Sequence, residues 1–400
     1  MGFHQVLKSI LIAGAGANQI GIIIKVRELG MHTIAMDGDA KAEGFKYADI
    51  AVCANILDAD TLEEMGKLYN INGIYPAAEL AVEAVAEAAQ RLNLPCFTPL
   101  VANRCRHKAA MRRALEFSDL PNPVYREAFT LAEARDCAVG IGFPLIIKPV
   151  DANSSKGVQR LESLDELHEA FDCAMKYSRA DTVLLEEFME GEEYCVDGLV
   201  NQGQYISGGI TGKERSELPY RFDTGIYMPP RLNQPELDII ETCAYNALKS
   251  IGFAHGTFHI EIIVTEEGPR IVEMAGRPGG GHIPTDLIPL AYGMDFMADS
   301  LRITLGEDPI STRHHERGAA LFWLSAQPGT VTAISGVDEA RALPGVQELV
   351  LNTQPGDILA PTVDCVARDA IGYVLCDGDS HDQAILHAKT ACATCTIHTA

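Results

Sequence analysis

Short apolar runs alternate with segments of helical periodicity through the first hundred residues. The apolar runs read SILIAGAG, HTIAMD and GIYPA, and PCFTP ends the series. The helical patterns between them run from about Gln19 to Leu29, Asp60 to Tyr69 and Leu80 to Leu92. Strands that alternate with helices form parallel sheets, because each helix carries the chain back to the same edge. We therefore predict an α/β domain over residues 1–100 with a doubly wound parallel sheet.

The pattern changes after residue 100. Residues 101–135 show helical periodicity up to a proline turn, and a compact α+β segment follows over about 124–200. A longer mixed segment extends to about 315, and a β-rich tail over 316–400 includes a final helix near 381–391. A chain of 400 residues typically holds two or three domains. We predict three, over 1–100, 101–315 (with a lid subdomain at about 124–200) and 316–400.

Two glutamates lie on either side of a predicted turn. The segment TFHIEIIV (257–264) alternates apolar and polar positions and predicts a strand whose polar face carries His259 and Glu261. TEEGP supplies the turn, and RIVEMA predicts the returning strand. A loop over residues 265–269 pairs Val264 with Arg270, which places Glu261 opposite Glu273. Like charges in that position are destabilising. Either water screens them on an exposed face, or a cation such as Mg²⁺, which prefers oxygen ligands, lies between them.

A lysine ends the apolar strand of FPLIIKPVDANSSKGVQRL (143–161). Lys148 is expected to be buried there and therefore to need an anionic partner. The small residues 152–157 follow, and such a loop lets backbone N–H groups close over phosphates. The alternative is a surface hairpin, which leaves Lys148 unexplained. A second lysine, Lys108, belongs to RHKAAMRRAL, whose helical pattern predicts an exposed basic face.

Carboxylates also follow the apolar strand of TVLLEEFMEGEEYCVDGLV (182–200). Glu186, Glu187, Phe188 and Met189 end that strand, and Glu193 opens the next one. These positions are either surface residues or the acceptors and main-chain edge that an adenosine requires.

Composition narrows the classes of partner. The formal net charge of −23 argues against nucleic acid and anionic membranes. No stretch approaches eighteen uninterrupted apolar residues, so we expect no membrane span. Eleven scattered cysteines fit a reducing cytoplasm better than a disulfide framework.

A glycine-rich turn near the N-terminus offers another interpretation. GAGANQIG (14–21) follows the first predicted strand, and Asp37 ends the second, as in dinucleotide-binding proteins. The spacing is Gly-x-Gly-x-x-x-x-Gly rather than Gly-x-Gly-x-x-Gly. An NAD-dependent oxidoreductase is therefore the alternative from another class, and it gives no role to Lys148 or to the glutamate pair.

Taken in order, these stretches resemble the ATP-grasp superfamily. The resemblance covers the N-terminal α/β domain, the linker lysine, IIKP with its small-residue loop, EEFMEGEEY, the paired acids of HIEIIV and IVEMAGR, and the C-terminal domain. Within the superfamily the chain is most similar to carboxylate–amine ligases of the L-amino-acid ligase and biotin carboxylase group. The resemblance implies a small carboxylate and an amine as substrates, ATP with Mg²⁺ or Mn²⁺ as cofactors, an acyl-phosphate intermediate and a cytoplasmic enzyme. It is compatible with a homodimer.

The resemblance also implies residue roles. Arg277 would steady the acyl phosphate, Glu261 and Glu273 would bind metal, and His259 with Gly279, Gly280 and Gly281 would contact substrate. The ATP-binding set would be Lys108, Lys148, Ser154, Ser155, Lys156, Gly157, Val158, Glu186, Glu187, Phe188, Met189 and Glu193.

One position departs from the family pattern. The usual third metal-site residue is an asparagine two positions after the second glutamate, and Ala275 stands there instead. We still expect activity, with a second metal held more loosely. Two further interpretations remain, a purine-pathway enzyme that acts on a ribonucleotide amine and a binding protein of this superfamily without turnover.

Overall fold

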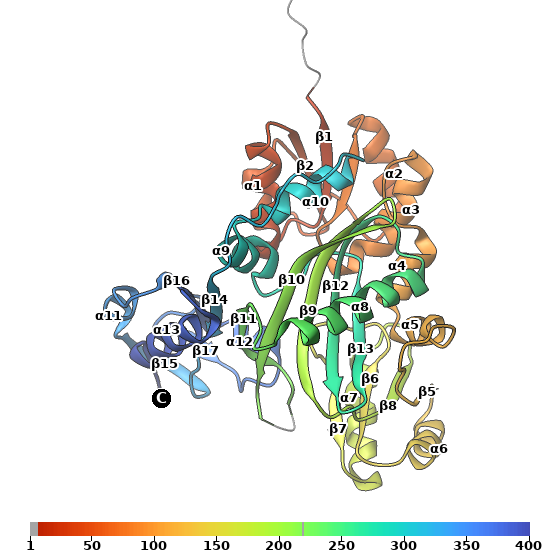
Figure 1. Ribbon diagram of the computed structural model, residues 1–400, viewed down its shortest axis with the longest axis vertical. Helices are drawn as coiled ribbons and strands as arrows, with labels where there is room; N and C mark the ends of the chain where they lie inside the picture. The colour runs from red at the N-terminus through yellow and green to blue at the C-terminus, as the bar shows by residue number, and fades with distance from the viewer. Residues whose placement is uncertain (1–6, 218–219) are drawn as a thin grey trace, which may run out of the picture.

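The computed structural model describes residues 7–217 and 220–400 (Figure 1). Its N-terminal sheet has four parallel strands in the order β3-β2-β1-β4. The strands are β1 (Ser9–Ala13), β2 (His32–Asp37), β3 (Ile50–Cys53) and β4 (Gly73–Pro76). Ile10 and Ile12 pack with α1 (Ile20–Glu28), whereas Leu11 and Ala13 pack with α2 (Ala59–Leu68) and α3 (Val82–Leu92) on the opposite face. Helices on both faces confirm the predicted doubly wound sheet.

The predicted boundaries in this region agree with the structure to within about two residues, with two exceptions. The segment PCFTP, expected to continue the strand series, is irregular and leads into α4 (Pro99–Arg106), which Thr98 caps. Strand β3 was not predicted, because only four residues form it and they alternate between half-buried and exposed.

A smaller antiparallel sheet lies at the opposite end of the molecule, below α4 and α5 (Lys108–Leu115) in Figure 1. Its order is β5-β8-β6-β7, formed by β5 (Tyr125–Ala128), β8 (Val183–Glu187), β6 (Leu145–Pro149) and β7 (Gln159–Leu161). Helices α6 (Leu131–Ile141) and α7 (Leu167–Tyr177) share one apolar core with it. We call this unit the lid sheet.

An eight-stranded sheet connects the two ends in the order β13-β12-β9-β10-β11-β14-β18-β16. Its strands are β9 (Glu192–Asn201), β10 (Gln204–Arg215), β11 (Asp223–Met228), β12 (Gly256–Thr265), β13 (Gly268–Ala275), β14 (Gly318–Trp323), β16 (Val346–Leu351) and β18 (Gly372–Gly378). Phe258, Ile260 and Ile262 pack with α8 (Gln234–Ile251) on one face. The alternate positions of β12 therefore turn their polar side chains to the other face, where the site lies.

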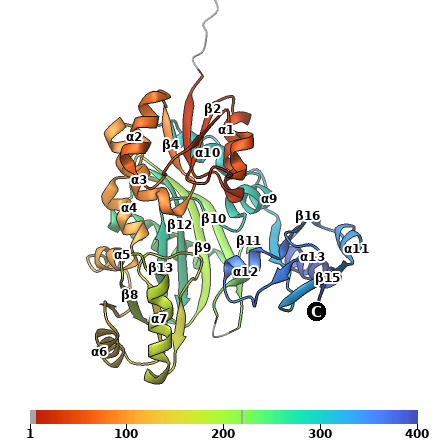
Figure 2. The same ribbon diagram turned by 180° about the vertical axis from the view of Figure 1, so that it is seen from behind.

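The C-terminal elements continue this sheet through β14, β18 and β16. They add α13 (His381–Thr394), which agrees with the predicted final helix, and a small sheet of β17 (Ile358–Leu359), β15 (Gly329–Ser335) and β19 (Thr396–Thr399). Helices α11 (Val337–Arg341) and α12 (Cys365–Asp369) complete this part, which projects to one side of the molecule in Figures 1 and 2. Between β13 and β14 the chain forms a π-helical turn (Ile283–Leu287), α9 (Ile288–Tyr292) and α10 (Phe296–Thr304).

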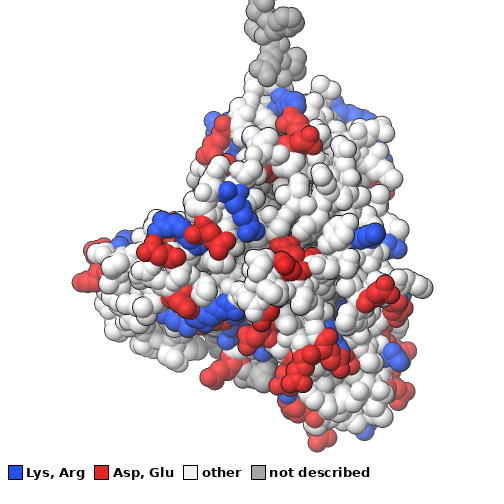
Figure 3. All heavy atoms as spheres, viewed as in Figure 1, with Lys and Arg blue, Asp and Glu red and all other residues white. Residues whose placement is uncertain are grey.

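Within the described residues, no helix combines the length and apolar character required to cross a bilayer. On the face drawn in Figure 3, acidic and basic side chains are interspersed, and acidic ones gather toward the lower end.

Candidate active site

The β12–β13 hairpin brings Glu261 and Glu273 opposite each other, as predicted, but by a different register. The turn contains only Glu266 and Glu267, so Ile263 pairs with Arg270 and the predicted Val264–Arg270 pair is wrong. A bulge between Glu261 and Ile262 then skips Val272 and restores the Glu261–Glu273 pair. The sequence predicted strands that were too short at the turn, and it gave no signal for the bulge.

A lysine contacts each of these glutamates. Lys213 Nζ on β10 lies 2.6 Å from Glu261 Oε1, and Lys108 Nζ at the start of α5 lies 2.9 Å from Glu273 Oε2. Burial alone would raise the pKa of Glu261, but Lys213, followed by His259 and Arg215, holds this pKa well below its ordinary value of 4.5. Two carboxylates that each contact a lysine are a hard-oxygen donor pair that fits Mg²⁺ or Mn²⁺.

A buried cluster of charges lies at the end of the lid sheet. Lys148 Nζ is 2.6 Å from Glu186 Oε2, and Arg112 approaches the same carboxylate at 2.6 Å and 3.2 Å. Lys148 is therefore buried beside an anionic partner, as predicted. Arg112 is fully buried, so the expectation that RHKAAMRRAL exposes its basic face is wrong for this residue. Two cations share one carboxylate, which leaves the cluster with net positive charge.

The pKa values in this cluster follow from that imbalance. Burial would raise the pKa of Glu186, but Arg112 and Lys148 lower it to about 2. Burial also lowers the pKa of Lys148, and the cations Arg112 and Lys108 add to this effect while Glu186 opposes it. An anion such as a phosphate would compensate the excess positive charge.

One cavity brings most of the predicted ATP-binding residues together between the lid sheet and the eight-stranded sheet. The predicted residues that line it are Lys108, Lys148, Ser154, Ser155, Lys156, Val158, Glu186, Glu187, Phe188, Met189, Glu193, Glu261 and Glu273. Gly157 is the exception. It has φ +70° and its α-carbon faces Ala174 and Tyr177, so it turns the loop rather than lining the cavity.

The loop over residues 152–158 is fixed at its start. Lys108 Nζ donates a hydrogen bond to the carbonyl oxygen of Ala152 at 2.7 Å. Ser154 and Ser155 both adopt positive φ, at 59° and 58°, a conformation that is uncommon for residues other than glycine. The tight turn that these residues form, with small side chains, lets an anion approach the backbone closely.

The carboxylate of Glu186 is not available as the acceptor expected for an adenine, because Arg112 and Lys148 occupy it. Glu187 pairs with Arg270, and the N–H groups of Glu187 and Phe188 donate to the carbonyls of Val124 and Pro144. Met189 is buried and forms part of the cavity wall.

Glu193 belongs to a second charge cluster that the sequence reasoning missed in part. Lys213 lies 2.8 Å from Glu193 and 3.8 Å from Asp223, and Arg215 lies 2.6 Å from Glu193 and 2.9 Å from Asp223. Lys213 and Arg215 are two positions apart on β10, so period-two alternation places them on one face. That spacing in GKER was a usable signal for a cationic face.

A larger cleft of about 780 Å³ lies beside this first cavity, and Asn153 lines both. It is bordered by the N-terminal glycine turn, by Arg277 and by the three predicted glycines. Arg277 Nε donates to Glu79, and its Nη1 donates to the carbonyl oxygen of Pro278 at 2.7 Å. Burial would raise the pKa of Glu79, but Arg277 and Arg106 lower it, so the anchor of Arg277 is ionised.

The three glycines have different surroundings. A Cβ on Gly279 would lie 2.6 Å from Asp197 Oδ1 and 2.7 Å from His259 Nδ1. Gly281 has φ +62° and its position faces Trp323 and Ile226. Only Gly280 faces open space, since a Cβ there meets no heavy atom within 4 Å. Gly280 is therefore the position of the three at which a side chain would enter the cleft.

His259 is held within the sheet. Its Nδ1 lies 3.0 Å from Asp197 Oδ2, and the backbone N–H of Gly279 donates to Asp197 Oδ1 at 2.8 Å. His259 Nε2 lies 4.0 Å from Glu261 Oε1, so His259 is positioned at the edge of the glutamate pair.

The dinucleotide interpretation loses its main support. Asp37 accepts hydrogen bonds from the backbone N–H groups of Ala15 and Asp39, at 2.8 Å and 2.9 Å. Its carboxylate therefore fixes the glycine turn, whereas a dinucleotide site requires this acid for a ribose.

Comparisons with known proteins identify two domains along the chain. Residues 141–286 match the family model of the ATP-grasp domain, and residues 322–400 match that of the L-amino acid ligase C-terminal domain 2. The uncharacterized protein y4rH of Sinorhizobium fredii is 29% identical over 390 residues, covering 94% of this chain and 79% of that protein. A formate-dependent phosphoribosylglycinamide formyltransferase of Salmonella schwarzengrund is 24% identical over 409 residues, covering 97% and 96%.

The crystal structure of an L-amino acid ligase from Bacillus licheniformis has the same fold, with a TM-score of 0.84, 21% identity, and coverage of 98% of this chain and 99% of that chain. The chain therefore contains an ATP-grasp domain and an L-amino acid ligase C-terminal domain, and it has the fold of ATP-grasp carboxylate–amine ligases.

Proposed function

We propose that the protein joins a small carboxylate to an amine, forming an amide or peptide bond with release of ADP and phosphate. The carboxylate in this proposal is an amino acid or a compound of similar size. The match to the C-terminal domain of L-amino acid ligases and the fold of one such ligase support this choice.

The observation that carries the proposal is the junction of two unlike cavities. One holds the buried cations and the glutamate pair, and the other holds Arg277 and the glycine loop. Asn153 lines both, so a phosphoryl group in the first cavity can meet a carboxylate in the second. A reaction that begins with transfer of the γ-phosphoryl group to a carboxylate requires this arrangement.

The residues suit two successive steps. In the first, a carboxylate oxygen attacks the γ-phosphorus and ADP leaves, while Lys108 and Lys148 hold phosphate oxygens. Glu261 and Glu273 would hold Mg²⁺, which would supply Lewis-acid polarisation of the phosphates. In the second, the amine attacks the acyl carbon, phosphate leaves, and the amine loses a proton. Arg277 offers N–H donors to the oxygens of the acyl phosphate in both steps.

The charges of the larger cleft bear on the amine. Its lining includes four carboxylates and a single arginine, and Glu79 engages that arginine. The carboxylates are those of Glu79, Asp286, Glu348 and Asp369. Asp369 pairs with Arg368 at 2.8 Å, so Asp286 and Glu348 are the two carboxylates of this lining without a lysine or arginine partner among the described residues. These two would repel a phosphate on the substrate, so we favour an amine without a phosphate group. The purine-pathway alternative rests on the relative of 24% identity, which is named as acting on a phosphoribosyl compound.

The test is an ADP-release screen over pairs of amino acids, hydroxy acids and aminated nucleotides, followed by mass analysis of the product. The expected result is ADP release that needs both a carboxylate and an amine, with a product of amide mass. Release only with aminated nucleotides would favour the purine-pathway alternative. Absence of ADP release with every pair would favour the alternative of a binding protein without turnover. Hydride transfer with NAD would favour the alternative of an oxidoreductase.

A further inference from the structure

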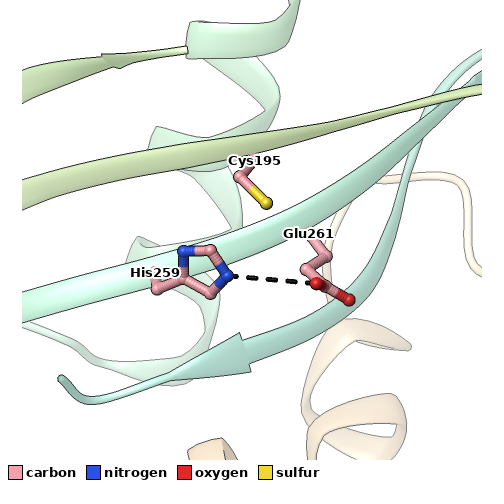
Figure 4. A group of neighbouring side chains, drawn as sticks. All are labelled: Cys195, His259 and Glu261. Carbon is pink, nitrogen blue, oxygen red and sulfur yellow. Dashed lines mark ion pairs between the residues drawn. The ribbon is translucent and has the colours of Figure 1, made fainter. Parts of the chain in front are cut away.

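Four polar side chains form a two-by-two array on the site face of the eight-stranded sheet. Cys195 and Asp197 come from β9, and His259 and Glu261 come from β12. The register pairs Cys195 with Glu261 and Asp197 with His259. Directly paired residues on antiparallel strands project to the same side, so the four side chains are neighbours. Figure 4 shows Cys195, His259 and Glu261 of this array.

Three of these side chains offer metal-ligand atoms at close range. The thiol sulfur of Cys195, a ring nitrogen of His259 and a carboxylate oxygen of Glu261 all lie within 4.8 Å of one another. Among the residues that the structure describes, this is the only such group of three. His259 Nε2 and Glu261 Oε1 are 4.0 Å apart, too far for a hydrogen bond. The nitrogen and oxygen ligands of a tetrahedral Zn²⁺ lie about 3.4 Å apart. His259 Nε2 and Glu261 Oε1 must therefore approach each other by only about 0.6 Å.

The histidine is oriented as a ligand. Its Nδ1 faces the Asp197 carboxylate at 3.0 Å, which leaves Nε2 directed at Glu261. Metal-binding histidines almost always donate their other N–H to a carboxylate or carbonyl, which fixes the tautomer. Asp197 is itself fixed by the backbone N–H of Gly279 at 2.8 Å. The support around the ligand group is therefore present before any ion binds.

A fourth polar group lies next to the trio. Thr211 on β10 pairs directly with Cys195, and its hydroxyl oxygen is buried without a hydrogen-bond partner among the described residues. A tetrahedral ion with three protein ligands keeps one position for water. A water at that position would give this hydroxyl a partner.

We propose that Cys195, His259 and Glu261 form a binding site for Zn²⁺ or a similar thiophilic divalent cation, distinct from the Mg²⁺ pair but sharing Glu261 with it. A thiolate–imidazole–carboxylate set selects zinc over magnesium, because magnesium disfavours sulfur ligands. Binding releases the thiol proton, and any proton on Nε2, to solvent. Lys213 must give up Glu261, and it retains Glu193 at 2.8 Å.

The site has a consequence for the enzyme, and this part rests on the proposed function. Zinc that occupies the trio withdraws Glu261 from the Glu261–Glu273 pair. The zinc-bound enzyme is therefore inhibited, and magnesium relieves the inhibition by competing for Glu261.

The binding test uses Co²⁺ as a spectroscopic probe on the full chain without nucleotide. The expected result is one equivalent of cobalt with a thiolate-to-metal absorption band, which zinc then displaces. Cys195→Ser should abolish the band, and His259→Gln should weaken cobalt binding by more than the about ten- to a hundredfold that loss of an outer-shell partner costs. Cys243→Ser is the matched control, since Cys243 on α8 is also a buried thiol but lies in an apolar core, where its sulfur donates to the carbonyl oxygen of Pro269. Absence of the band in the natural protein, or its persistence in Cys195→Ser with circular dichroism unchanged, would overturn the site.

The inhibition test measures ADP release against zinc at fixed magnesium. The natural protein and Cys243→Ser should be inhibited at the same zinc concentration, whereas Cys195→Ser should require far more zinc. Equal sensitivity of Cys195→Ser would overturn the inhibitory role. Failure of the proposed function would appear as absent ADP release without zinc, and the cobalt band does not depend on that result.

Discussion

Lys213 on β10 lies 2.6 Å from Glu261 on β12, and its side chain is almost completely buried. Burial would lower the pKa of this lysine, but Asp223, Cys195, Glu193 and Glu261 raise it well above 10.5, so it is a permanent cation. Lys108 contacts Glu273 in the same manner. The structure thus balances both glutamates with ammonium groups, and a divalent ion bound between them must displace these contacts or share them.

Glu273→Gln removes the charge of one metal anchor but keeps its shape. We expect ADP release to fall by about a hundredfold or more, because loss of metal polarisation costs several kcal/mol of transition-state stabilisation. The measurement is the rate of ADP release as a function of Mg²⁺. Glu266→Gln is the control, since Glu266 is exposed in the turn of the same hairpin. An unchanged rate at saturating Mg²⁺ would contradict the metal assignment.

Lys148→Ala should weaken ATP binding about ten- to a hundredfold, the worth of one charge-assisted hydrogen bond of about 1.5–3 kcal/mol. The remaining Arg112 and Glu186 still neutralise each other, so the fold should survive. Calorimetric titration with ATP gives the affinity directly. Equal affinity in the variant and the natural protein would remove Lys148 from the phosphate site.

The pH dependence of ATP binding provides a further test of this lysine. Burial, Arg112 and Lys108 lower the pKa of Lys148, and only its protonated form attracts phosphate. ATP should therefore bind more weakly as the pH rises through this lowered pKa, at a lower pH than an ordinary lysine would give, and binding should take up protons. Lys148→Arg keeps the charge at every pH and should flatten the profile. Identical profiles for the two proteins would show that another group titrates.

Arg112 and Arg113 are neighbours on α5 with opposite environments, which makes them a matched pair for stability. Arg112 is buried and donates to Glu186 and to the carbonyls of Ile271 and Val272. Arg112→Leu should destabilise the fold by about 3–5 kcal/mol, since it leaves buried polar groups without a partner. Arg113→Leu should change stability by less than about 1 kcal/mol, because its pair with Glu127 is exposed. The measurement is the free energy of unfolding of both variants in urea. Equal losses of stability in the two variants would contradict the structure.

The contribution of the Glu186 cluster to the stability of the fold should also depend on pH. The folded-state pKa of Glu186 is lowered from 4.5 to about 2. Because this pKa is lowered in the folded state, ionised Glu186 stabilises the fold at pH values above its unfolded-state pKa. This contribution to the free energy of unfolding is lost as the pH falls from 4.5 toward 2.

Period-two alternation in the sequence was sufficient for part of this site. It placed His259 and Glu261 on one face of β12, whereas the Glu261–Glu273 pair agrees with the prediction only because the bulge at Val272 offsets the error in the predicted turn. The same rule applied to EEYCVDG selects Glu193, Cys195 and Asp197, and applied to GKER it selects Lys213 and Arg215. All five belong to the same face of the sheet, so this part of the site was predictable from spacing.

Other features depend on contacts between distant segments and left no local signal. The bulge at Val272 depends on how β12 and β13 pair, and the burial of Arg112 depends on β8 and β13 reaching α5. A helical pattern alone could not distinguish Arg112 from the exposed Arg113. Similarly, three consecutive glycines predict an unusual loop without showing which of them faces the cleft.

Gly280 is the one glycine of this loop at which a side chain would enter the larger cleft without a clash. Gly280→Leu should therefore narrow the range of accepted substrates, with bulky amines losing more rate than small ones, while ATP affinity stays unchanged. Gly279→Ala should instead reduce activity with all substrates, because its new Cβ would meet Asp197 and His259 at 2.6 Å and 2.7 Å. Gly280→Ala is the intermediate control and should affect only the largest amines. The measurement is product formation across a series of amines of increasing size, and ATP affinity measured by calorimetry is the control. If Gly280→Leu lowers the rate equally for small and bulky amines, the loop has a purely structural role and the amine enters elsewhere.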